Sequence, residues 1–208
     1  ASKGHTQYSE RVLDKLSSIC YKNERWEQAA KAYRQLYDET TNASTKKSSA
    51  SGYVASTLKY GSSADIVAMA DDVETLTEVT DVARRKARYA KATILLNEGR
   101  KEEALGIFRV LSAETKSAEG AEARYRLIEE EYQAGNLQKA ENMVYEFSDS
   151  KTPQNYWLAK AFILLGDIYM SRNDAFQARA TYQSVVDGYS PADDGIVDEA
   201  KSRIEKMN

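Results

Sequence analysis

A sequence pattern that returns roughly every 36–38 residues is the feature that most constrains how this chain can fold. Four segments share it: NERWEQAAKAYRQL, NEGRKEEALGIF, QAGNLQKAENMV and RNDAFQARATYQ. In each segment an alanine follows a turn residue by five positions, and these alanines are Ala29, Ala104, Ala140 and Ala178. The first interval is twice as long as the others, and Ile66, five positions after Gly61, divides it into two of the usual length. The spacing therefore predicts five units of one supersecondary motif.

The turn residues and the two prolines indicate what each unit contains. The turn positions hold Glu24, Gly61, Gly99, Gly135 and Asn173. Glycine and asparagine most readily adopt the left-handed conformation that ends many helices. Pro153 and Pro191 are separated by the same interval as Ala140 and Ala178, and each follows a Thr or a Ser. This order is typical of a helix N-cap followed by the first turn, so each unit is predicted to be two helices joined by a short turn.

We predict an all-α solenoid of about five helix pairs with one further helix at the C-terminus. The pairs run 8–22/25–38, 44–60/63–76, 80–97/100–113, 118–134/137–148 and 153–171/174–187, within units 8–40, 44–78, 80–116, 118–151 and 153–190. Residues 193–207 form the last helix, whose apolar residues share one face, as a capping helix requires. The segment 41–60 is rich in Ser and Thr and has two interpretations, a helix or a flexible linker. The solenoid spans 1–208, and a start at Ala1 rather than Met is compatible with the C-terminal part of a longer chain.

Composition and motif content argue against several kinds of function. The 208 residues carry a net charge of −3, and the pI is near 5.5, which is not the balance of a protein that binds nucleic acid. The longest apolar runs are too short for a transmembrane helix. His5 is the only histidine and Cys20 the only cysteine, so neither nucleophilic catalysis with a histidine base nor a structural zinc site is expected. Because no Gly-rich phosphate loop is present either, we expect no catalytic residues, no metal site and no cofactor.

A cluster of basic residues lies between positions 84 and 91. Its members are Arg84, Arg85, Lys86, Arg88 and Lys91. On a helix they do not form one stripe, because 84, 88 and 91 share a face that 86 does not. Glu78 and Asp81 are close enough in sequence to pair with part of the cluster. Two interpretations therefore stay open, a binding surface for an anionic ligand or partner and an ordinary solvated helix surface.

The helix-pair motif resembles the tetratricopeptide repeat (TPR). In the fifth unit, the residues at the signature spacing of that family are Phe162, Leu165, Gly166, Tyr169, Ala178, Tyr182 and Val185. The resemblance covers essentially the whole chain and implies a right-handed superhelical arrangement. The segment 117–147 is similar in its pattern of residues to bacterial cell-envelope proteins with many TPR units. This similarity implies a periplasmic or cell-envelope location and a role in envelope assembly.

The resemblance also implies where a partner would bind. In a TPR array the first helix of each pair lines a concave groove, at the eighteenth, fifteenth and eleventh positions before the alanine. In the third and fourth units these positions hold Lys86, Tyr89, Thr93, Glu122, Tyr125 and Glu129, and in the fifth unit Lys160, Ile163 and Asp167. Tyr89 and Tyr125 occupy equivalent positions, where they either stack along the groove or pack between repeats. The first two units hold Asp14, Ser18, Ser51 and Ala55, which argues against a carboxylate clamp built from Lys and Asn.

We therefore expect a non-catalytic scaffold for protein–protein interaction, which holds a peptide or partner segment of unknown identity in its groove. The second hypothesis is a structural spacer or self-association module of a larger repeat protein, with no dedicated groove ligand. Under either hypothesis the chain is expected to be a monomer or a weak homo-oligomer.

Overall fold

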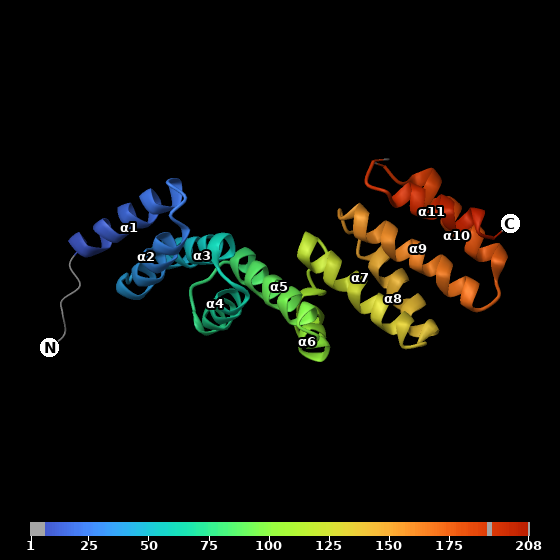
Figure 1. The fold of residues 1–208 in the computed structure, drawn as a ribbon, viewed down its shortest axis with the longest axis horizontal. Coiled ribbons are helices and arrows are strands. Elements are labelled where there is room, and N and C mark those ends of the chain that lie inside the picture. The colour runs from blue at the N-terminus through green and yellow to red at the C-terminus, as the bar shows by residue number, and fades with distance from the viewer. Residues whose placement is uncertain (1–6, 191–192, 208) are drawn as a thin grey trace. The chain divides into compact units, whose positions relative to one another are not determined.

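The computed structural model describes residues 7–190 and 193–207, and all regular structure in these ranges is α-helical. This confirms the all-α prediction. The helices labelled in Figure 1 are α1 (Gln7–Lys22), α2 (Trp26–Glu39), α3 (Ala43–Tyr60), α4 (Ser63–Thr75), α5 (Asp81–Asn97), α6 (Lys101–Leu111), α7 (Ala118–Gln133), α8 (Leu137–Asp149), α9 (Asn155–Ser171), α10 (Ala175–Gly188) and α11 (Ile196–Glu205). His5 and Pro191 lie outside the described residues.

The Ser- and Thr-rich segment 41–60 is helical rather than a linker. Asn42 is the N-cap of α3, and its side chain accepts a hydrogen bond from the backbone N–H of Thr45 at 3.0 Å. Within the helix, Ser51 and Thr57 donate their hydroxyl protons to backbone carbonyls four residues earlier, at 2.9 Å each. These bonds satisfy the hydroxyls of Ser51 and Thr57 within the helix, whereas the buried hydroxyls of Ser49 and Ser56 have no hydrogen-bond partner among the described residues. The small residues also allow close packing, since the Tyr33 ring lies directly over Gly52.

The turn positions adopt the left-handed conformation in four of the five units. The φ angle is 58° at Glu24, 78° at Gly99 and Gly135, and 61° at Asn173. At Gly61 it is −67°, so the expectation of a left-handed residue is wrong there. The reason is the next residue, Ser62, which forms a capping box with Asp65 at the start of α4. The chain enters this box in an extended conformation, and a left-handed turn is not needed.

The chain divides into two compact units, residues 1–107 and 108–208, with the boundary inside α6. In unit 1, α2 packs against α1 and α3, and α4 packs against α3 and α5. The central side chains of its core are Tyr37, Val54, Met69, Val73 and Leu76. Arg34 of α2 also reaches α4, where its Nε and Nη2 atoms donate to the two carboxylate oxygens of Asp72 at 2.6 and 3.1 Å.

In unit 2, α7 packs against both α8 and α9, and α10 packs against α9 and α11. One core cluster joins Ile128 of α7, Val144 and Phe147 of α8, and Leu165 and Ile168 of α9. A second cluster lies between α9, α10 and α11, with Ile163, Tyr182 and Ile196 at its centre. The helix predicted as a cap therefore contributes Ile196 and Ala200 to a shared core.

Candidate partner-binding surfaces

A cavity of about 380 Å³ lies in unit 1 between the first helices of three successive pairs, α1, α3 and α5. Its lining combines small residues, apolar residues and two lysines: Tyr21, Ser51, Val54, Ala55, Leu58, Lys59, Thr80, Val82, Ala83 and Lys86. Three of these, Ser51, Ala55 and Lys86, stand at the positions that the repeat register assigns to a groove. We call this cavity the unit 1 groove.

The two lysines of the unit 1 groove have no carboxylate partner among the residues that the structure describes. Lys59 comes from α3 and Lys86 from α5, and both side chains are exposed. Val82 adds exposed apolar surface at the rim, with 49% of its area accessible. A concave apolar surface with unpaired ammonium groups favours ligands that carry both apolar side chains and negative charge.

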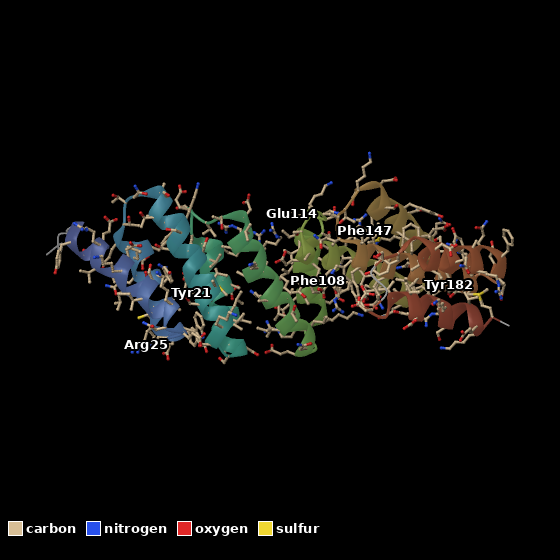
Figure 2. The ribbon with its side chains drawn as sticks, turned by 90° about the horizontal axis from the view of Figure 1, so that it is seen from above. Tyr21, Arg25, Phe108, Glu114, Phe147 and Tyr182 are labelled. Atoms are coloured by element: carbon tan, nitrogen blue, oxygen red, sulfur yellow. The ribbon has the colours of Figure 1, made fainter. Side chains whose placement is uncertain are left out.

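Tyr21, labelled in Figure 2, lines the groove from α1. Its ring packs edge-on against Trp26, with 5.0 Å between ring centroids, and against Tyr33 at 6.3 Å. Both partners belong to α2, so the orientation of the Tyr21 ring is set by the second helix of the same pair. This arrangement provides a rigid aromatic wall, the kind of surface that contributes strongly to protein recognition.

Tyr89 and Thr93, the other two residues predicted for the groove in α5, do not line this cavity. The Thr93 hydroxyl donates to the backbone carbonyl of Tyr89 at 3.0 Å, and Tyr89 is half-buried. Of the three groove positions predicted on α5, the structure therefore brings only Lys86 to the cavity wall.

Most of the basic cluster on α5 is paired within unit 1. The Arg88 guanidinium donates to both carboxylate oxygens of Glu74 at 2.7 and 2.8 Å. Arg84 donates to the backbone carbonyls of Val73 and Leu76 at 3.1 and 3.0 Å, and Lys91 pairs with Asp71. The acceptors all belong to α4 or to the residue after it, so these three basic side chains hold α5 against α4. Lys86 points to a different face, which agrees with its position on the helix.

The predicted groove positions of unit 2 come together around a second cavity, of about 240 Å³. Tyr125 and Glu129 of α7 and Lys160, Ile163 and Asp167 of α9 all line it. The helix α11 adds Glu199 and Arg203, which the sequence analysis did not identify as groove residues. These two stand one repeat interval of 36 residues after Ile163 and Asp167 in the chain, so extending the repeat by this interval to a sixth first helix would have found both.

The charged side chains of this second cavity all have partners within it. Arg203 donates to both oxygens of Asp167 at 2.8 and 3.2 Å, and Lys160 donates to Glu199 at 3.0 Å. The Tyr125 hydroxyl donates to Glu129 at 3.1 Å. Burial and this carboxylate together raise the pKa of Tyr125 well above its ordinary value, which keeps the phenol protonated as a donor. A ligand entering this cavity would have to displace internal partners.

Tyr125 is 8% exposed, and its ring packs beside Trp157 with 5.5 Å between centroids. The Lys160 ammonium group lies 5.8 Å from the centre of the same ring. The ring therefore lies mostly in the interior of unit 2 and presents little surface to a partner. Glu122, also predicted for the groove, does not line the cavity and accepts a hydrogen bond from Arg126 at 2.9 Å.

Among residues 7–190 and 193–207, no group of three or more His, Cys, Asp or Glu side chains is arranged to hold a metal ion. In the same ranges, no helix combines the length and apolar character that crossing a bilayer requires. Cys20 is buried as a free thiol in α1.

Comparison with known proteins assigns no family to the chain. No family model and no curated protein sequence matches it. Among solved structures, the crystal structure of BtubC (BKLC) from P. vanneervenii is similar with a TM-score of 0.46 and 19% sequence identity. The likeness covers 86% of this chain and 81% of that one. A likeness of this size assigns neither a function nor a binding partner.

Proposed function

We propose that this protein is a non-catalytic interaction module built from helix pairs of the TPR type, and that the unit 1 groove binds a segment of a partner protein. The observation that carries the proposal is the pair of unpartnered lysines, Lys59 and Lys86, beside the small and apolar residues of the unit 1 groove. The unit 2 cavity is also lined by helices, but its lysine and arginine already form ion pairs with Glu199 and Asp167.

The packing of the repeat residues supports the TPR part of the proposal. Ala29, Ala104, Ala140 and Ala178 are each 0% exposed. Gly166 occupies the small-residue position of the fifth helix pair. It faces the ring of Tyr182, which belongs to the second helix of the same pair. Small residues at these positions allow the two helices of a pair to approach closely, which is the role that the signature gives them.

The chemistry of the unit 1 groove favours one kind of segment. Ala55 and Leu58 provide apolar contact area on α3, and the two lysines provide positive charge at the edge. We expect a peptide that presents one or two apolar side chains to α3, with Asp, Glu or another anionic group within reach of an ammonium group. Exposed charges of this kind contribute to orientation and association rate as well as to affinity.

A peptide-display selection with the whole chain as bait tests the proposal. Peptides enriched from a random library are then measured against the wild-type chain and against the double variant Lys59→Glu/Lys86→Glu. We expect enrichment of acidic, apolar sequences and a loss of affinity of at least about tenfold in the double variant, which corresponds to about 1.4 kcal/mol. The matched control is Lys201→Glu/Lys206→Glu, which makes the same charge change at exposed positions of unit 2 and is expected to leave affinity within about twofold.

Two outcomes contradict the proposal. Enriched peptides that bind the groove variant as tightly as wild type would place the binding surface elsewhere. A selection that yields no peptide dependent on Lys59 or Lys86 would favour the alternative function, a structural spacer whose groove has no ligand.

A further inference from the structure

The first helix carries a stripe of exposed apolar side chains that nothing described in unit 1 covers. Tyr8 is 77% exposed, Val12 45%, Leu16 47% and Ile19 54%. At about 100° per residue these four side chains fall within an arc of about 80°. We call them the α1 stripe. The neighbouring face of α1, which carries Leu13, Ser17 and Cys20, is buried, so the helix is already anchored without the stripe.

The repeat register shows that the position at the centre of the stripe, that of Val12, is buried in the other helix pairs. Val12 of the first helix pair corresponds in register to one residue in each later pair, and these residues are Ser49, Ala87, Ala123 and Ala161. Each of the four is 0% exposed. The α1 stripe is therefore the surface of a first helix that, elsewhere in the chain, packs against other helices.

Unit 2 shows what covers this face. Leu165 and Ile168 of α9 correspond in register to Leu16 and Ile19, and they are 2% and 0% exposed. They belong to one core cluster with Ile128 of α7 and with apolar side chains of α8. The cover is thus a pair of helices that presents apolar side chains, and a helical occupant has the shape to fit the α1 stripe as well.

Charge distinguishes among possible helical occupants. Arg11, Lys15 and Lys22 lie along one edge of the stripe, within an arc of about 40°. All three are exposed, and none forms an ion pair with another described residue. In an antiparallel pair of two identical helices, like edges face each other, so these charges oppose the pairing of two α1 helices. They favour a partner whose apolar face is edged by Asp and Glu.

The geometry points to the α1 stripe as a docking site for an acidic amphipathic helix of a partner protein. This site is separate from the unit 1 groove, because Tyr21, the α1 residue that lines the groove, lies on the opposite side of the helix by the same angular measure. The inference therefore does not depend on the proposed function of the groove.

Two matched helical peptides of about 18 residues serve as probes, a length at which such helices begin to be stable. Both carry Leu at the first and fourth positions of each heptad; one has Glu and the other Lys at the flanking positions. Fluorescence anisotropy measures their binding to the whole chain. We expect the Glu peptide to bind more tightly, and more so at low salt. The variant Leu16→Asp should lose at least about tenfold in affinity, and Arg11→Glu/Lys15→Glu should invert the preference between the peptides.

The control variant is Phe176→Asp, which places the same charge on an exposed apolar residue of α10, 80% accessible, and should leave binding within about twofold. Circular dichroism verifies that each variant is folded. Equal binding of the two peptides, or binding that Leu16→Asp does not weaken, overturns the inference. Self-association that depends on Leu16 would assign the stripe to a second copy of the chain, and Leu16-dependent binding to phosphatidylserine vesicles would assign it to a membrane; either result also overturns it.

Discussion

The close packing of α9 against α10 depends on the absence of a side chain at Gly166. A methyl group at this position would lie 2.2 Å from Cε1 and 2.6 Å from Cζ of Tyr182, whereas ordinary contacts begin near 3.4 Å. The Tyr182 ring, labelled in Figure 2, is 1% exposed, and its hydroxyl donates to Asp167 at 2.6 Å. The ring therefore cannot move far enough to admit the methyl group without losing core packing or this hydrogen bond, and Gly166→Ala is expected to destabilise unit 2.

Two opposing effects set the magnitude. Overpacking a filled core costs roughly 1–3 kcal/mol, while alanine is better than glycine inside a helix by roughly 0.8–1 kcal/mol. Because the added carbon would lie only 2.2 Å from the ring, the overpacking cost falls in the upper part of its range, roughly 2–3 kcal/mol, and the net loss for Gly166→Ala is about 1–2 kcal/mol. For a unit of about 100 residues, each kcal/mol shifts the melting temperature by roughly 4–8 °C. The variant should therefore melt about 5–15 °C below wild type.

Thermal and urea unfolding, followed by circular dichroism, measure the effect, and hydrogen exchange assigns it to unit 2. Gly188→Ala is the matched control: it makes the same change in α10, with nothing within 4 Å of the added carbon, and is expected to be neutral or to stabilise by up to about 1 kcal/mol. In a Tyr182→Leu background the cost of Gly166→Ala should nearly vanish. If Gly166→Ala were as stable as wild type, the close packing of these two helices would be refuted.

Three further predictions concern unit 1. The Tyr37 hydroxyl oxygen accepts hydrogen bonds from two backbone N–H groups of the loop after α4, at 3.1 and 3.2 Å, so Tyr37→Phe should lower the free energy of unfolding by roughly 1–3 kcal/mol in urea denaturation. Asp72→Asn removes the carboxylate that Arg34 binds through two hydrogen bonds; because both side chains are about two-thirds covered, a loss of about 1 kcal/mol is expected in the same assay. The Arg88 hydrogen bond holds the pKa of Glu74 below its usual 4.5, so the stability that this carboxylate contributes is present above that value and is lost as the pH falls. Between about pH 5 and 3, wild type should therefore lose more stability than Glu74→Gln.

The helix pairs can be predicted from sequence because the residues that define the repeat have strict packing requirements. An alanine at the closest point between two helices cannot become larger without displacing the partner helix, and the four alanines of the register are all fully buried. The left-handed turn residues at Gly99, Gly135 and Asn173 follow from the same need to reverse the chain after one helix. Gly61 departs from this pattern because the residues after it form a capping box, a signal that the turn spacing alone does not contain.

The candidate sites are less predictable because they depend on which charges meet in space. The sequence shows five basic residues between 84 and 91, but not that Glu74 and Asp71 of α4 lie opposite Arg88 and Lys91. Nothing in the local sequence of Lys59 separates it from an ordinary surface lysine. The role proposed for it follows only from the position of α3 between α1 and α5.

The same repeat positions carry different chemistry in the two units, and this difference decides where a partner should be sought. In unit 2, Arg203 and Lys160 are held by Asp167 and Glu199, and breaking such partly buried pairs leaves charges without partners unless the ligand replaces each bond. In unit 1, Lys86 has no bond of this kind to lose, so an acidic ligand gains its contacts without that penalty. Charge reversal in the unit 1 groove should therefore weaken binding by at least about tenfold at low cost in stability. By contrast, Arg203→Glu should first destabilise the packing of α11 on α9, which a lower melting temperature of unit 2 would reveal.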